Sequence, residues 1–101
     1  TLRVNAHTCR TIVHGDQTGG QLTIVLVDSP AGDGVPTHVH ELEDEVFHVL
    51  EGKVQVIVDG QATILVPGQT AFGPRDLPHS WLALEPSRMV ISATPSGLER
   101  M

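Results

Sequence analysis

Short apolar runs, separated by turn signals roughly every eight to twelve residues, extend along the sequence without helical periodicity. Most runs are rich in β-branched residues, and Gly, Pro, Asp and Ser gather between them, as is typical of strands joined by turns. We expect a strand that carries His38 and His40, and further strands over residues 4–13, 21–28, 46–50, 53–58, 61–66, 69–73, 79–84 and 88–94. Many short strands with frequent turns predict a small all-β sandwich or barrel.

The clearest hairpin signal is Asp59-Gly60, which separates the runs KVQVIV and QATILV. Asp-Gly between two such runs is typical of a two-residue type I′ turn, in which both central residues have positive φ. At the carboxyl end, Ser96 and Glu99 fit a capping box, S-x-x-E, which opens a helix. Because a single turn is not stable alone, we expect this helical turn to pack on the barrel or a partner, or to continue past Met101.

Composition is that of an ordinary globular protein with one domain over residues 1–101, of which 40% are hydrophobic and 18% charged. The net charge of −6 disfavours nucleic acid and anionic membranes as partners, since both bind basic faces. The single cysteine, Cys9, predicts a half-buried strand residue, and the lack of disulfides agrees with a cytoplasmic location. A small barrel with open strand edges predicts a homodimer.

Candidate chemistry is concentrated in residues 32–52, GDGVPTHVHELEDEVFHVLEG. His38 and His40 are two apart, so on a strand both imidazoles point to the same side. Glu45 opens the next apolar run, and Glu43 shares its strand parity. Two imidazoles and one carboxylate that converge on a point are typical ligands of a divalent transition metal, and His79 is a fourth candidate. The alternative is a solvated polar loop, but a buried carboxylate is costly unless it is paired or bound to a metal.

This stretch resembles the first cupin motif, a glycine, five residues, H-x-H, three or four residues, E, six residues and G. The residues that fit it are Gly32, His38, His40, Glu45 and Gly52. The resemblance implies a cupin double-stranded β-helix, a jelly-roll barrel. By motif spacing it also implies that Glu45, rather than Glu43, is the carboxylate ligand.

The second cupin motif is a glycine, five residues, P-x-G, two residues, H, three residues and N, and Gly68, Pro74 and His79 fit it. Asp76 stands where the pattern has glycine and Ala83 where it has asparagine, which affects the turn and a polar contact but removes no ligand. The resemblance therefore implies one divalent ion, Fe, Mn, Ni, Co, Cu or Zn, held by His38, His40, Glu45 and His79.

Strand parity extends the prediction from the ligands to a pocket, because side chains two apart share a face. We expect a small-molecule pocket lined by Phe47, Val49, Val56, Trp81 and Ala83. His48 has the opposite parity and should face away from the metal. Glu41, Glu43 and Asp44 are expected to form a solvated acidic rim, and Arg75 and Asp76 a surface ion pair.

The resemblance, which includes residues 94–100, is to single-domain cupins similar to quercetin 2,3-dioxygenase. It implies a metal-dependent dioxygenase that uses O₂ on a flavonol-like, 1,3-diketone or enol small molecule. Glu45 would act both as ligand and as proton acceptor. Two alternatives stay open: a cupin that binds a metal and a small ligand without turnover, and a metal-dependent isomerase or lyase.

Overall fold

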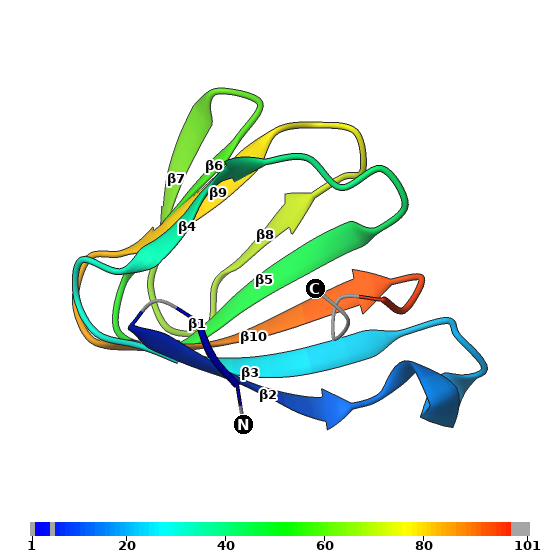
Figure 1. Ribbon diagram of the computed structural model, residues 1–101. Coiled ribbons are helices and arrows are strands. Elements are labelled where there is room, and N and C mark those ends of the chain that lie inside the picture. The colour runs from blue at the N-terminus through cyan, green and yellow to red at the C-terminus, as the bar shows by residue number, and fades with distance from the viewer. Residues whose placement is uncertain (1, 5, 98–101) are drawn as a thin grey trace.

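In the computed structural model, which describes residues 2–4 and 6–97, ten strands form two antiparallel sheets (Figure 1). The strands are β1 (Leu2–Val4), β2 (His7–Val13), β3 (Thr23–Ser29), β4 (Gly34–His38), β5 (Asp44–Glu51), β6 (Val54–Val58), β7 (Gln61–Leu65), β8 (Thr70–Gly73), β9 (His79–Ala83) and β10 (Ser87–Thr94). One sheet has the order β1-β2-β3-β10-β5-β8 and the other the order β4-β9-β6-β7. The all-β prediction is confirmed. Within the described residues the helical content is one 3₁₀ turn, Gly15–Thr18, and no helix could cross a membrane.

Alternation of side chains along each strand builds the core between the sheets. Along β3, Thr23, Val25, Val27 and Ser29 are buried, while the residues between them are partly exposed. The buried apolar side chains come from both sheets: Val25, Val27, Phe47, Val49, Val54, Val56, Leu65, Trp81, Ala83, Met89 and Ile91. Removal of this apolar surface from water is the main force that holds the two layers together.

Most predicted turns and strands agree with the structure; the exceptions are the amino-terminal segment and the strand predicted to carry both His38 and His40. Asp59 and Gly60 have φ values of 49° and 80°, which confirms the type I′ hairpin between β6 and β7. The segment 4–13, predicted as one strand, instead contributes to two strands, β1 and β2, which pair with each other. The predicted helical turn at 96–99 extends outside the described residues. Within them, Ser96 donates its amide to the carbonyl of Gly20 at 3.0 Å.

A close approach between β4 and β9 depends on Gly34. A Cβ atom at this position would collide with the backbone carbonyl of Trp81, so only glycine lets the two strands meet here. The pairing runs from Gly34 opposite Leu82 to His38 opposite His79. The glycine at one end of the pair thus helps to place two histidines side by side at the other end.

Candidate metal centre

Four potential metal ligands meet at one end of the sandwich, and they come from both sheets. His38 ends β4 and His79 begins β9 beside it, while Glu45 lies on β5 of the facing sheet. The loop after β4 supplies His40, so the prediction that His38 and His40 share a strand is wrong. One donor atom from each residue lies within 4.8 Å of the others, so the four predicted ligands do form a cluster that could hold a metal ion.

The Nε2 atoms of the three imidazoles face the carboxylate and one another. Nε2 of His40 lies 3.1 Å from Nε2 of His38 and 2.9 Å from Oε1 of Glu45. Nε2 of His79 lies 3.4 Å from Oε2 of Glu45, an ion-pair contact without hydrogen-bond geometry. Glu45 is only 3% exposed, so its carboxylate is almost completely withdrawn from water.

The backbone orients two of the imidazoles. Nδ1 of His38 bonds the carbonyl of Pro36 at 2.8 Å, and Nδ1 of His79 bonds the carbonyl of Leu77 at 3.2 Å. Because a carbonyl oxygen only accepts hydrogen bonds, each Nδ1 must carry the hydrogen. In the neutral ring each Nε2 then presents its lone pair to the cluster, which is the tautomer that metal ligation requires.

Glu43 provides the corresponding contact for the third imidazole. Its Oε2 lies 3.5 Å from Nδ1 of His40, and its side chain is only 15% exposed. The prediction of a solvated acidic rim is therefore wrong for Glu43, while Glu41 is exposed as expected. Glu43 lies behind His40, so the choice of Glu45 as the acid inside the cluster agrees with the structure.

A metal ion fits this donor set. Nε2 of His79 is fully buried and has no hydrogen-bond partner within the described part of the chain. Burying such a nitrogen and the Glu45 carboxylate without coordination would be costly. Three imidazole nitrogens and one carboxylate oxygen suit Fe, Mn, Co, Ni, Cu or Zn. The cluster therefore resembles a metal site, and its donor types leave the metal's identity open.

Two of the histidines have shifted pKa values in opposite directions. Burial lowers the pKa of His40 below its ordinary value of 6.5. The Glu45 carboxylate next to Nε2 raises the pKa of His79 above 6.5, although burial opposes this. At neutral pH a larger fraction of His79 than of His40 is therefore protonated. His79 must lose this proton before its Nε2 can bind a metal.

The loop between β8 and β9 packs on this end of the sandwich and is fixed there by Arg75 and Asp76. The carboxylate of Asp44 accepts hydrogen bonds from the Arg75 backbone amide, Nε and Nη2 at 2.8, 3.3 and 3.0 Å, and this lowers the pKa of Asp44. The predicted Arg75–Asp76 ion pair is therefore wrong, because Asp44 is the partner. Asp76 has a φ of 70°, a left-handed conformation that explains glycine in the motif.

The five residues predicted to line a pocket all belong to the hydrophobic core. Phe47, Val49, Val56, Trp81 and Ala83 are each at most 5% exposed, and the Phe47 ring centroid lies 6.0 Å from that of His79. They lie between the sheets, as strand parity predicts. That they contact a bound small molecule stays a prediction.

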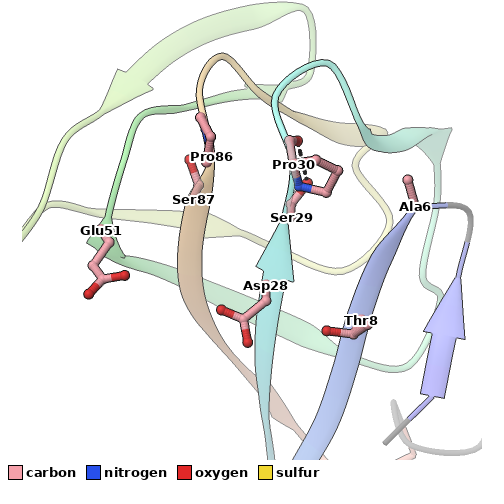
Figure 2. A pocket seen from close by; sticks show the side chains of 8 residues that line it. All are labelled: Ala6, Thr8, Asp28, Ser29, Pro30, Glu51, Pro86 and Ser87. Carbon is pink, nitrogen blue, oxygen red and sulfur yellow. Dashed lines mark hydrogen bonds between the residues drawn. The ribbon is translucent and has the colours of Figure 1, made fainter.

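The surface has two open depressions. One, of about 430 Å³, is at the far end of the sandwich, where Figure 2 shows Asp28, Glu51 and Ser87 around it. The other, of about 390 Å³, lies over β4, β9 and β6 and includes Gln55 and Ile57. Neither is lined by a residue of the metal-site-like cluster.

Sequence reasoning missed a third buried histidine, His7, at the start of β2. It is 2% exposed, its Nδ1 lies 2.5 Å from Oδ2 of Asp33, and its ring meets the Trp81 ring edge-on at 5.0 Å between centroids. The available signal was parity, since His7 is two residues from Cys9, which packs against the core as predicted. No pattern pointed to its partner, 26 residues away.

Comparison with known proteins agrees with this architecture. Residues 25–93 match the family described as Cupin domain (Cupin_2). The fold is similar to KdgF from Halomonas sp., with a TM-score of 0.89 and 24% identity over 100% of this chain and 89% of that chain. It is also similar to an RmlC-like cupin from Shewanella frigidimarina, with a TM-score of 0.82 and 20% identity over 97% of this chain and 84% of that chain. A third similar structure is salicylate 1,2-dioxygenase from Pseudoaminobacter salicylatoxidans, with a TM-score of 0.76 and 24% identity. The match covers 89% of this chain but only 25% of the dioxygenase chain. No protein of curated function matches the sequence.

Proposed function

This chain belongs to the cupin family, and we propose that it is a metal-dependent dioxygenase acting on a flavonol-like, 1,3-diketone or enol small molecule. The observation that carries the proposal is the cluster of His38, His40, Glu45 and His79. Three of the four are buried, while His38 is partly exposed, which is where a substrate and O₂ would enter. The likeness in fold to a salicylate 1,2-dioxygenase supports the same class of chemistry.

The four side chains would hold one divalent ion, Fe, Mn, Ni, Co, Cu or Zn, through three Nε2 atoms and a Glu45 oxygen. When bound, such an ion supplies a Lewis acid with open coordination positions and, if redox-active, the chemistry that O₂ needs. Pro36 and Leu77 hold the imidazoles of His38 and His79 in the required tautomer through their carbonyl groups.

Glu45 handles the proton in this proposal. Its Oε1 and Oε2 lie 2.9 and 3.4 Å from Nε2 of His40 and His79, so the carboxylate is fixed from two sides. A base that is held in place in this way can accept a proton without first reorganising. One of its oxygens takes the proton that the enol hydroxyl of the substrate loses. The apolar side chains beside it, beginning with Phe47, exclude water from the reacting group.

The test is O₂ uptake by protein loaded separately with each candidate metal, in the presence of quercetin and of acetylacetone. We expect uptake with at least one pairing, and a loss of roughly 10²–10⁴-fold in Glu45→Gln, which cannot accept the proton. His48→Ala serves as the matched control, because His48 bonds Thr70 at 2.9 Å outside the cluster. Metal content is measured for each variant, so that a direct loss of activity can be distinguished from a loss of activity caused by loss of the metal.

The other outcomes are informative because the same ligands permit other chemistry. Substrate conversion without O₂ uptake would replace the proposal with a metal-dependent isomerase or lyase. Binding of substrate without conversion would replace it with a ligand-binding module. No uptake with any metal or substrate would contradict the dioxygenase assignment.

A further inference from the structure

We propose that two copies of this chain associate as a two-fold dimer through the outer face of the larger sheet. This outer face consists of the outward side chains on five neighbouring strands, β2, β3, β10, β5 and β8. The sequence led us to expect a homodimer but left its interface open. The outer face lies on the side of the sheet away from the metal-site-like cluster, so association does not depend on the proposed reaction.

The register of the strands aligns the outward side chains of this face in two rows. Burial alternates along β3, β5 and β10, so every second residue of these strands points away from the core. The first row crosses the sheet from β2 to β8 through Arg10, Leu26, Val90, His48 and Thr70. The second row crosses from β3 to β8 through Ile24, Ser92, Val46 and Phe72.

Most of these outward side chains are apolar, although they face water. Phe72 is 55% exposed and its neighbour Val46 on the adjacent strand is 37% exposed. Ile24, Leu26 and Val90 are partly exposed beside them. Single apolar residues on a surface are ordinary, whereas adjacent ones on several strands are typical of an interaction site. The outer face of the larger sheet therefore has the composition of an interface.

The distribution of charge allows a second copy to be the partner. Two copies, each with a net charge of −6, repel each other wherever their acidic surfaces meet. The two rows contain no carboxylate, and their one charged residue is Arg10 at the β2 margin. The next outward carboxylates, Asp28 on β3 and Asp44 on β5, each form an ion pair with an arginine of the same chain. Two copies can therefore approach through this face without bringing unpaired carboxylates together.

The area of the face is sufficient for a dimer. The larger sheet forms one whole layer of the molecule (Figure 1). Five strands spaced about 4.8 Å apart, with about seven residues each at about 3.3 Å per residue, present a surface of roughly 24 Å by 23 Å. Two such surfaces in contact would bury roughly 1,100 Å², above the limit of about 1,000 Å² expected of a biological interface. Because a two-fold axis makes both copies use the same surface, each apolar side chain contributes twice.

The outer face of the smaller sheet also carries exposed apolar residues, among them Ile64 and Leu82, but it is too small. Its four strands have five residues each, so the same dimensions per strand and per residue give roughly 19 Å by 17 Å. Two copies would bury roughly 650 Å² there, which is in the range of chance contacts. A depression of about 390 Å³ over β4, β9 and β6 further reduces the contact that a flat partner could make. This face therefore supplies the control.

Sedimentation equilibrium over a range of protein concentrations tests the proposal. We expect the wild-type protein to have twice the monomer mass at about 100 μM, and Phe72→Asp to raise the dissociation constant at least tenfold. Phe72→Lys should have the same effect, which shows that charge within an apolar contact is responsible and not added negative charge. Ile64→Asp is the matched control, because Ile64 is 51% exposed on the smaller sheet, and it should leave the dissociation constant unchanged. Circular dichroism checks that each variant is folded.

A second measurement uses the unaltered protein and needs no variant to fold. Isotope-filtered NMR of mixed labelled and unlabelled copies detects contacts between the two chains of a dimer. We expect such contacts at the methyl groups of Leu26, Val46 and Val90. Contacts at Ile64 and Leu82 instead would overturn the proposal, as would a monomer mass at every concentration up to about 1 mM. Equal weakening by Phe72→Asp and Ile64→Asp would also overturn it.

Discussion

The backbone amide of Asp76 donates a hydrogen bond to the carbonyl oxygen of His40 at 2.8 Å. This bond ties the loop that precedes His79 to the loop that carries His40, so two ligands from distant parts of the sequence are held in one frame. Asp76 makes the bond from a left-handed conformation, with a φ of 70°. Aspartate tolerates this region better than most residues, which is why the turn survives without the glycine of the motif.

Replacing Asp76 tests the cost of that conformation. Asp76→Ala should lower the free energy of unfolding of the metal-free protein by about 1 kcal/mol, because alanine is strained at positive φ. Asp76→Gly should be at least as stable as the wild type, since glycine adopts this φ freely. Urea denaturation followed by circular dichroism measures both. An alanine variant more stable than the glycine variant would contradict the strain argument.

Removal of any one imidazole from the cluster should sharply reduce metal affinity. For His38→Ala, His40→Ala and His79→Ala we expect a loss beyond the roughly 10–100-fold that follows from changing only a group that supports a ligand. His48→Ala should retain full affinity, because His48 bonds Thr70 instead. Zinc titration with a competing chelator gives the affinities. Full retention of zinc by any of the first three would remove that residue from the ligand set.

Metal binding near pH 7 should release protons, chiefly from His79. In the metal-free protein its raised pKa means that the protonated ring stabilises the fold fully below pH 6.5, and that this contribution is lost as pH rises through the folded pKa. Metal affinity should therefore begin to fall as pH drops below that folded pKa, which lies above 6.5. Calorimetry in two buffers of different ionisation enthalpy measures the released protons. Heats that do not depend on the buffer would contradict this.

The His7–Asp33 pair should support the fold without affecting the metal. His7→Ala empties a buried site and should cost on the order of 2–3 kcal/mol of unfolding free energy. Zinc affinity should stay unchanged, because His7 lies at the start of β2, beside the end of β3 that is remote from the cluster. Arg10→Ala, an exposed change on the same strand, should stay within about 0.5 kcal/mol. A large loss of zinc affinity in His7→Ala would show instead that the two ends of the barrel are coupled.

The same pair makes a prediction about pH. The hydrogen bond with His7 lowers the pKa of Asp33 below 3.8. The ionised carboxylate therefore stabilises the fold above pH 3.8, and that contribution is lost as pH falls through the folded pKa. Carboxyl NMR titration should place the pKa of Asp33 below 3.8 in the wild type and closer to 3.8 in His7→Ala. Equal values in the two proteins would mean that the bond does not form.

Sequence spacing predicted the strands and the four clustered side chains because both depend on local pattern. Period-two alternation decides which side chains enter the core. The motif spacing identified His79 as the distant partner of His38 and His40. Parity also placed His48 outside, where it bonds Thr70 at 2.9 Å.

Such local patterns could not predict contacts between loops that are distant in the sequence. Asp44 and Arg75 are 31 residues apart, and the sequence offered Asp76 as a nearer partner. His40 lies beyond the end of β4, where strand parity no longer applies. The loop nevertheless turns its ring back to the cluster, because Asp76 holds the His40 carbonyl. These placements depend on how loops pack on the finished barrel.

The cluster draws its donors from both layers, His38 and His79 from one sheet and Glu45 from the other. An ion bound by all of them would cross-link the two sheets at this rim of the sandwich. Separating the layers at that rim would then require rupture of coordinate bonds, whereas at the opposite rim the Ser87 hydroxyl is hydrogen-bonded to the Lys53 backbone and His7 contacts Asp33. Loading with metal should therefore raise the force needed to separate the sheets at the rim that carries the cluster.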